Sequence, residues 1–361
     1  MYCLGIESSC DETGLAVVCD GRLVGQVLAS QVDMHALFGG VVPELASREH
    51  ARAIGPLFDE LMARTGLQPQ QIDTIAVSRG PGLLGSLLVG VAFAKALALG
   101  TGARIIGINH LHAHLLSVGL TEPLHYPTLG LLVSGGHTNI YRIDSPIDFH
   151  ELGRTIDDAC GEAFDKVGNL LGMRYPSGRF VDCAARLGTK TIDFPIPYMD
   201  NDTLDFSFSG LKTAVAQEIA KRYPTIPWER PVERVDNLPR DVFDLCASFS
   251  YALAETLVRK LERAFVRNPA IHTCLLAGGV AANSLIREKI ASLCARHDAE
   301  LLVPEAHLCT DNGAMVAYAG WLLSSMGYSH SIDFETIPRG RTIPVDFQWN
   351  KQYDQRCGQQ S

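Results

Sequence analysis

The sequence lacks a CxxC pair, an excess of basic residues and a basic leader segment. Its ten cysteines have no secretory context, so we interpret them as reduced thiols of a cytoplasmic protein, mostly small core residues. The start, MYCLGIESSCDE, has neither a basic region nor a long apolar run, which argues against a signal peptide. The net charge of −9 argues against a protein that coats nucleic acid over its whole surface, although it permits a local basic surface.

Only one segment, residues 83–100, resembles a membrane span. Lys95 and three glycines lie inside it, so we expect a buried packing helix and no contact with a membrane.

The length of 361 residues and the repeated strand-then-helix pattern favour two α/β domains. The stretch 191–240, rich in proline and charge, is expected to be irregular, and the tail from 328 to be loosely structured. The main elements expected are strands at 2–7, 14–19, 74–78, 104–108, 129–133 and 273–277, and helices at 44–64, 83–100, 241–267 and 312–326.

Two common nucleotide-binding motifs are missing. Residues 80–85, GPGLLG, match GxGxxG, but no acidic residue follows at the distance that a ribose contact needs, and Pro81 removes a backbone donor. A Walker A lysine is also absent. The sequence therefore argues against a Rossmann dinucleotide site and against a P-loop.

Two histidines lie four residues apart in NHLHAHLLS, which puts His110 and His114 on one helix face, within reach of one metal ion. Leu111 stands where a zinc protease of the HExxH type has glutamate. Asp311, in HLCTDNGAM, is a candidate third ligand, and such a set leaves coordination positions open for a substrate. An ordinary histidine pair and a helix-capping Asp311 are the alternative interpretation.

Two apolar strands end in Gly-Gly, in LLVSGGHT (131–138) and LLAGGVAAN (275–283). Such turns expose backbone N–H groups to an anion, so two copies indicate a phosphorylated ligand, although tight turns alone would explain either copy. In GEAFDK (161–166), Asp165 either belongs to a solvated helix turn or binds a ribose hydroxyl or ligand amine.

A series of motifs in this chain follows the order of a known family: ESSCDET, GGVVPELASREH, SRGPGLLGSL, NHLHAH, LVSGGHT, GEAFDK, DFSFSGLKT, LAGGVAAN and CTDNGAM. By these motifs, the chain resembles the bacterial TsaD (Gcp/YgjD/Kae) family of tRNA N6-adenosine threonylcarbamoyltransferases over about residues 2–325.

The resemblance implies the two-lobed, actin-like ATPase fold of sugar kinases and Hsp70, with a central cleft. We assign residues 1–112 to an N-terminal lobe completed by the helix at 312–326, residues 113–311 to a C-terminal lobe, and 328–361 to a tail.

The resemblance also implies an activity, the transfer of threonylcarbamoyl from threonylcarbamoyl-AMP to N6 of adenosine 37 in tRNAs that read ANN codons. It implies one divalent metal, commonly iron, with zinc or magnesium also seen, on His110, His114 and Asp311. No covalent nucleophile is expected. The substrate-binding positions that it implies are Val133, Ser134, Gly135, Gly136, His137, Asp165, Gly178, Asp182 and Asn283.

The chain departs from the family in one loop, where YPSGR (175–179) replaces the usual YPGGP, which affects the assignment of Gly178 and Asp182. The partners implied are tRNA, a TsaB-type heterodimer partner, a TsaE-type ATPase and a TsaC-type synthase that makes the donor. Two groups of basic residues could bind the tRNA phosphates. The first is Arg259, Lys260, Arg263 and Arg267, for which a solvated helix face is the alternative interpretation. The second is Arg339 with Arg341.

Three other functions compete with the transferase. A small-molecule kinase on the same fold would use ATP and a carboxylate base and would not need the histidine pair. A metalloprotease is disfavoured by Leu111. A non-catalytic nucleotide-binding scaffold within a complex is the third alternative.

Overall fold

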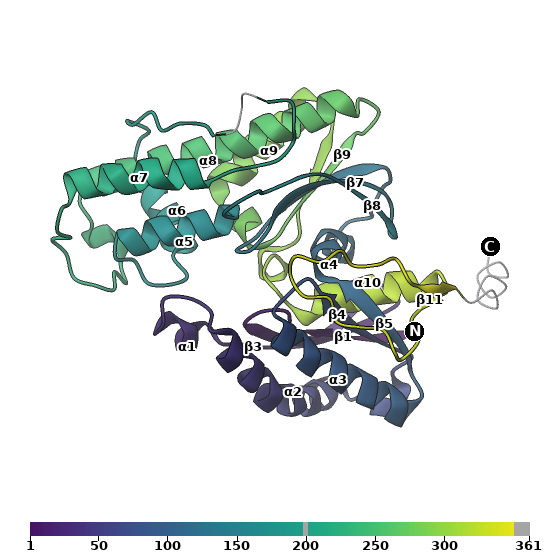
Figure 1. The fold of residues 1–361 in the computed structure, drawn as a ribbon. Helices are drawn as coiled ribbons and strands as arrows, with labels where there is room; N and C mark the ends of the chain where they lie inside the picture. The colour runs from purple at the N-terminus through teal and green to yellow at the C-terminus, as the bar shows by residue number, and fades with distance from the viewer. Residues whose placement is uncertain (198–200, 350–361) are drawn as a thin grey trace. The chain divides into compact units, whose positions relative to one another are not determined.

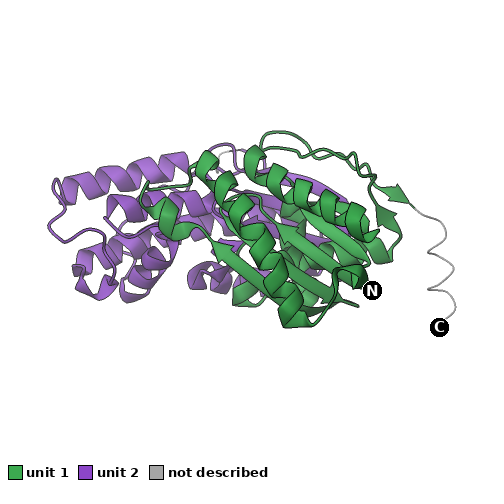
Figure 2. Ribbon diagram, turned by 90° about the horizontal axis from the view of Figure 1, so that it is seen from below, with its two compact units in different colours: residues 1–124, 304–361 green, residues 125–303 purple. Residues whose placement is uncertain are grey.

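The structure is a computed structural model that describes residues 1–197 and 201–349. The chain forms two compact units (Figure 2): unit 1 comprises Met1–Leu124 and the segment from Pro304 onward, and unit 2 comprises His125–Val303. These boundaries differ from residues 112 and 311, because α4 (His110–Leu116) packs against α10 (Gly313–Ser325) and stays in unit 1.

A five-stranded sheet in the order β3-β2-β1-β4-β5 forms the centre of unit 1. The first three strands form an antiparallel meander, and β4 and β5 run parallel to β1. The four strands expected here are confirmed, whereas β3 escaped the sequence analysis because its exposed positions weaken the apolar signal. The strands are β1 (Tyr2–Glu7), β2 (Glu12–Cys19), β3 (Arg22–Ser30), β4 (Thr74–Gly80) and β5 (Arg104–Asn109).

The helices of unit 1 cover both faces of this sheet, with α10 on one face and α2 (Pro43–Thr65) and α3 (Leu84–Thr101) on the other (Figure 1). Glycines let α10 approach the strands closely: a Cβ on Gly14 would lie 2.6 Å from the amide nitrogen of Gly313. The remaining elements of this unit are α1 (Val32–Ala36), β11 (Tyr328–Ser329) and β12 (Gln348–Trp349), with short 3-10 helices at Pro69–Gln71, Ser117–Leu120 and Ala306–Leu308.

The helix α3 is the only one in the described residues that is long and apolar enough to cross a membrane by length and composition. A single such helix is weak evidence for a span. One side of it, with Leu87, Val91 and Ala94, is buried and packs against the sheet and α2, but only 33% of the helix is buried, so the expectation of a buried packing helix is confirmed for one side only.

Unit 2 repeats the arrangement of unit 1, with a sheet in the order β10-β9-β6-β7-β8. Here β6, β7 and β8 form the antiparallel meander, and β9 runs parallel to β6 with β10 beside it. The elements are β6 (Thr128–Val133), β7 (Thr138–Ser145), β8 (Asp148–Arg154), α5 (Cys160–Leu170), α6 (Gly178–Leu187), α7 (Ser209–Arg222), η3 (Val235–Asn237), α8 (Arg240–Arg267), β9 (Thr273–Ala277), η4 (Gly279–Ala282), α9 (Ser284–Arg296) and β10 (Glu300–Leu302).

Two expectations of irregular structure are wrong in part. The stretch 191–240 contains α7, whose Leu211, Val215 and Ile219 recur every four residues and are buried. The tail from 328 packs on unit 1, where Phe334 is buried and the Arg79 guanidinium donates to Asp346 at 2.6 Å. Residues 198–200 and 350–361, which belong to these two segments, lie outside the described residues.

Candidate metal centre and glycine turns

The two histidines of the candidate metal centre lie on α4, directly after β5. Asn109 caps this helix, because its side-chain oxygen accepts a hydrogen bond from the Leu111 N–H at 3.0 Å. The i to i+4 spacing brings the rings of His110 and His114 edge to face, with their centroids 4.7 Å apart.

The third residue, Asp311, precedes α10 and comes from the far end of the chain. Asn312 caps α10 by accepting the Met315 N–H at 3.0 Å, so the capping role lies one residue after Asp311. The tight contact of Gly313 with β2, where a Cβ would lie 2.5 Å from the Leu15 carbonyl carbon, fixes the start of α10. The Asp311 carboxylate is thereby held beside α4.

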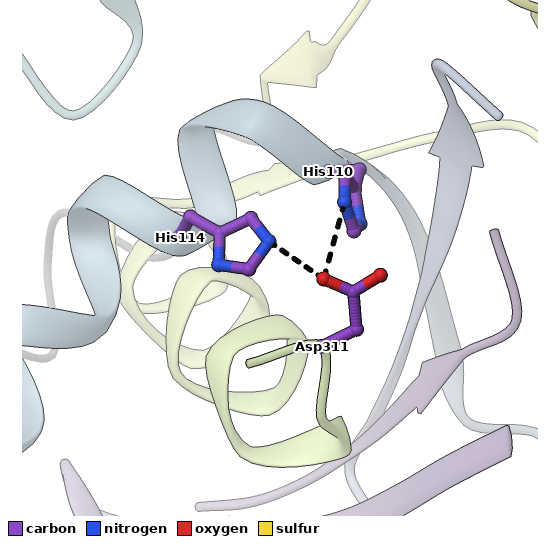
Figure 3. Close-up of side chains that lie close together, drawn as sticks. All are labelled: His110, His114 and Asp311. Carbon is purple, nitrogen blue, oxygen red and sulfur yellow. Dashed lines mark hydrogen bonds and ion pairs between the residues drawn. The ribbon is translucent and has the colours of Figure 1, made fainter. Parts of the chain in front are cut away.

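The three side chains converge (Figure 3). Oδ1 of Asp311 lies 3.0 Å from Nε2 of His114 and 3.7 Å from Nε2 of His110. Both imidazoles are buried and the aspartate side chain is 22% exposed, and all three ligand atoms lie within 4.8 Å of one another. Two imidazole nitrogens and one carboxylate oxygen suit a transition-metal cation and leave further coordination positions open.

Acidic groups surround the cluster. Burial alone would lower the pKa of His110, but the carboxylates of Glu7 and Asp311 raise it to about 9. The pKa of Glu12 lies well above its usual value because of burial and the neighbouring charges of Asp311 and Asp11. The charges of Glu7 and Asp311 beside the imidazoles create a negative field that favours a cation.

Residue-level reasoning passed over Glu7, although the motif ESSCDET begins with it. The structure shows it fully buried, with Oε2 at 3.0 Å from Nδ1 of His110. The sequence did contain a signal for this contact, since Glu7 is a charged residue at the end of an otherwise apolar strand. An unpaired buried carboxylate is costly, so such a residue is expected to have a partner.

In unit 2, the two Gly-Gly turns lie side by side. Leu132 on β6 pairs with Ala277 on β9, so both strands deliver their turns to the same sheet edge. Gly278 has φ +92° and its position would bring any Cβ into the carbonyl oxygen of Val133, so only glycine fits. The first turn connects antiparallel β6 and β7 and does not lead into a helix.

The first turn also contacts the start of α5. The Gly161 N–H donates to the Ser134 carbonyl oxygen at 3.1 Å, and a Cβ on Gly161 would lie 2.8 Å from Gly135 Cα. Ser134 closes the turn through its own N–H, which donates to the His137 carbonyl oxygen at 2.8 Å. In this structure the Ser134 amide therefore serves the turn itself.

The other expected substrate residues form two pairs. Asp165 accepts hydrogen bonds from the backbone N–H groups of Ser177 at 2.6 Å and Gly178 at 3.1 Å, so it holds the YPSGR loop at the start of α6. Its contacts are thus structural, whatever it binds in addition. The second pair joins α6 to α9: Ser284 donates to Asp182 at 3.3 Å, and the adjacent Asn283 caps α9.

Comparison with known proteins identifies the family. The family model described as "TsaD: tRNA N6-adenosine threonylcarbamoyltransferase" matches residues 22–318. A curated protein of that enzyme name from Desulfovibrio desulfuricans is 57% identical, covering 98% of each chain. A second, from Nitratidesulfovibrio vulgaris, is 56% identical over 96% of this chain and 98% of its own.

Solved structures agree on the fold. HypF from T. kodakarensis matches with a TM-score of 0.57 at 15% identity, over 89% of this chain and 47% of that one. The activator of the 2-hydroxyisocaproyl-CoA dehydratase from Clostridium difficile matches with a TM-score of 0.50 at 13% identity, over 89% of this chain and 94% of that one. These likenesses confirm the actin-like ATPase fold and carry no function. With its sequence matching over nearly its whole length, the chain belongs to the TsaD family of tRNA N6-adenosine threonylcarbamoyltransferases.

Proposed function

We propose that this protein transfers the threonylcarbamoyl group from threonylcarbamoyl-AMP to N6 of adenosine 37 in tRNAs that read ANN codons. The observation that carries the proposal is the convergence of His110, His114 and Asp311 in a chain of the TsaD family. The proposed cofactor is one divalent cation, Fe²⁺ in preference to Zn²⁺ or Mg²⁺. Imidazole ligands suit iron and zinc, whereas magnesium prefers oxygen ligands.

The reaction asks mainly for placement. The N6 amine of adenine is a poor nucleophile because its lone pair is delocalised into the ring, but the donor carbonyl is part of a mixed anhydride with AMP as a good leaving group. A divalent cation, when bound, supplies a Lewis acid that polarises a carbonyl oxygen. The chain must hold the two substrates in register, and we assign no covalent nucleophile.

Unit 2 is proposed to hold the adenylate. The Gly-Gly turns approach each other at one sheet edge beside the start of α5, and helix starts and exposed turn amides favour an anion. The nucleoside is assigned to the two residue pairs around α6. The residues proposed are Val133, Ser134, Gly135, Gly136 and His137 for the phosphate or the developing oxyanion, and Asp165, Gly178, Asp182 and Asn283 for the nucleoside.

The α8 residues of the expected basic track serve the fold instead. Lys260 is fully buried and donates to the Thr203 carbonyl oxygen at 2.8 Å. Arg263 and Arg267 donate to the carbonyl oxygens of Asn201 and Asp202, and Arg259 pairs with Glu255. These charges bind a neighbouring segment and α8 itself, which disfavours a phosphate track along this face and supports the alternative of a helix face without tRNA contact.

Other surfaces remain for the substrate tRNA. Arg339 and Arg341 are exposed in the tail, and we retain them as proposed phosphate contacts. Adenosine 37 lies in a single-stranded loop, so it can be splayed out at modest cost.

A TsaB-type partner, a TsaE-type ATPase and a TsaC-type donor synthase remain proposals, as does a cytoplasmic location. For the TsaB-type partner, α3 presents the side chains of Leu84, Leu88 and Leu99, which are 49%, 50% and 75% exposed. We expect Leu88→Glu to weaken the heterodimer in size-exclusion chromatography, and Val266→Glu on α8 to leave it intact.

For the proposed cytoplasmic location, all cysteines in the described part of the chain are free thiols, in keeping with a reducing compartment.

The test is reconstitution with tRNA, threonine, bicarbonate, ATP and the synthesising partners, followed by nucleoside mass spectrometry. Wild type should form threonylcarbamoyladenosine and His114→Ala should not. His307→Ala is the matched control, because this histidine is exposed, pairs with Glu305 and is not one of the three residues of the cluster. Equal amounts of modified adenosine from wild type and His114→Ala would contradict the proposed metal centre. If wild type forms no modified adenosine but phosphorylates a small molecule with ATP, the kinase alternative is favoured.

A further inference from the structure

Glu7 is a buried carboxylate without a place in the ligand set. It is the last residue of β1, fully buried, and its two oxygens accept three hydrogen bonds. Oε1 accepts from the Ser9 N–H at 2.6 Å, and Oε2 accepts from the Ser78 hydroxyl and from Nδ1 of His110 at 3.0 Å. Three donors around one carboxylate satisfy its oxygens inside the protein.

The sheet topology brings this carboxylate to His110. β1, β4 and β5 run parallel, so their carboxyl ends lie at one edge of the sheet. Glu7 ends β1, Ser78 lies near the end of β4, and His110 follows β5 directly. Backbone pairing therefore fixes the distance between Glu7 and His110, independently of the loops.

The contact decides which ring nitrogen of His110 can bind a cation. When Nδ1 carries the proton that is donated to Glu7, the lone pair of the neutral ring lies on Nε2. Nε2 is the atom that faces Oδ1 of Asp311, at 3.7 Å. We propose that Glu7 is a positioning residue, which orients the His110 ring and selects the tautomer that offers Nε2 to a divalent cation.

The two histidines differ in this respect. Nδ1 of His114 is buried and has no hydrogen-bond partner among the described residues, so packing alone holds that ring. The Ser9 hydroxyl also approaches Nδ1 of His110, at 3.3 Å, but it is uncharged and farther away than Glu7. His110 is thus the ligand whose orientation the protein fixes by a charged acceptor, as carboxylates do behind metal-bound histidines.

The inference about Glu7 rests on the proposed metal centre, and the experiment distinguishes a failure of the inference from a failure of the metal centre. Zn²⁺ is the probe, titrated into metal-free protein against a competing chelator. Glu7→Gln should weaken Zn²⁺ binding by about 10- to 100-fold, because the amide cannot accept from all three donors. Thr13→Val is the matched control: Thr13 lies on β2, which pairs with the strand of Glu7, and the substitution breaks its buried hydrogen bond of 2.7 Å to His50 on α2. This control should lower the melting temperature and leave Zn²⁺ affinity within about threefold, since the bond that it removes is to His50, which is not a proposed ligand.

A measurement on wild type keeps the test independent of how the variant folds. In Zn²⁺-loaded protein with ¹⁵N-labelled histidine, long-range ¹H–¹⁵N correlation should show His110 protonated at Nδ1 and coordinated through Nε2. Coordination through Nδ1, or unchanged Zn²⁺ affinity in folded Glu7→Gln, overturns the role of Glu7 alone. Wild-type Zn²⁺ binding that His114→Ala leaves unchanged overturns the metal centre and this inference together.

Discussion

The candidate metal centre of unit 1 and the glycine turns of unit 2 are built in opposite ways. The metal centre consists of three side chains in buried, acidic surroundings, and the strands and helices of unit 1 serve only to position them. The second consists of backbone, where Gly278 and Gly161 are needed because no Cβ fits. A side-chain site loses its chemistry when one group is removed, whereas a backbone site loses its shape when one group is added.

The largest effect is expected from removing a ligand. Asp311→Ala deletes the only carboxylate of the cluster and should reduce modified adenosine in the reconstituted assay by about 100-fold or more. The helix cap is provided by Asn312, so the melting temperature of the metal-free protein should change little. Loss of activity together with unfolding would show instead that Asp311 serves the fold.

Adding one methyl group to the backbone site should have the next largest effect. Gly278→Ala forces a Cβ into the Val133 carbonyl oxygen at a φ of +92°, and should destabilise the protein by about 1–3 kcal/mol or more. Urea unfolding measures this cost. Gly210→Ala on α7 is the matched control, because nothing lies within 4 Å of its Cβ and alanine favours a helix.

The metal centre should respond to pH. The pKa of His110 is raised to about 9, so its proton must leave before a cation binds, and Zn²⁺ affinity should rise with pH between 6 and 8. Stability of the metal-free protein should move the other way. Because the pKa of His110 is higher in the folded than in the unfolded protein, its protonation stabilises the folded state. This contribution is complete below about pH 6.5, the usual pKa of histidine, and is lost as the pH rises towards 9. Zn²⁺ titrations and thermal unfolding at several pH values check both signs, and flat profiles would contradict the assigned environment.

The smallest effect is expected on α8. Arg259 pairs with Glu255 across one helix turn at 3.3 Å and is half exposed, so Arg259→Ala should cost about 0.5 kcal/mol or less. Its tRNA affinity in a filter-binding assay should equal that of wild type, whereas Arg341→Ala should weaken binding. The reverse result would restore the basic track on α8.

Local sequence patterns predicted many of the elements in both units. Strand 273–277 agrees with β9 residue for residue, and the helices α2 and α8 agree within one residue at each end. These elements are long or fully buried, so apolar periodicity marks them well. The tail was mispredicted because its anchors are single residues, such as Phe334 and His330, which contact distant strands and leave no periodic signal.

The site was predicted unevenly for a related reason. His110 and His114 form a pair through helix geometry alone, and Asp311 was a candidate by residue type that the resemblance to the family also implies. The sequence analysis missed Glu7 and assigned Lys260 to a surface track, because a charged residue is expected to be exposed to solvent unless its partners are known. A buried charge is explained by contacts that lie far away in the sequence.

The sequence by itself determined the family, the α/β class and the residues able to bind a metal, since these depend on composition, order and short-range spacing. Only the tertiary structure decided that Asp311 meets α4, that Glu7 stands behind His110 and that the two Gly-Gly turns are neighbours. The physical reason is that parallel strand pairing and helix packing join residues whose separation along the chain exceeds any local pattern.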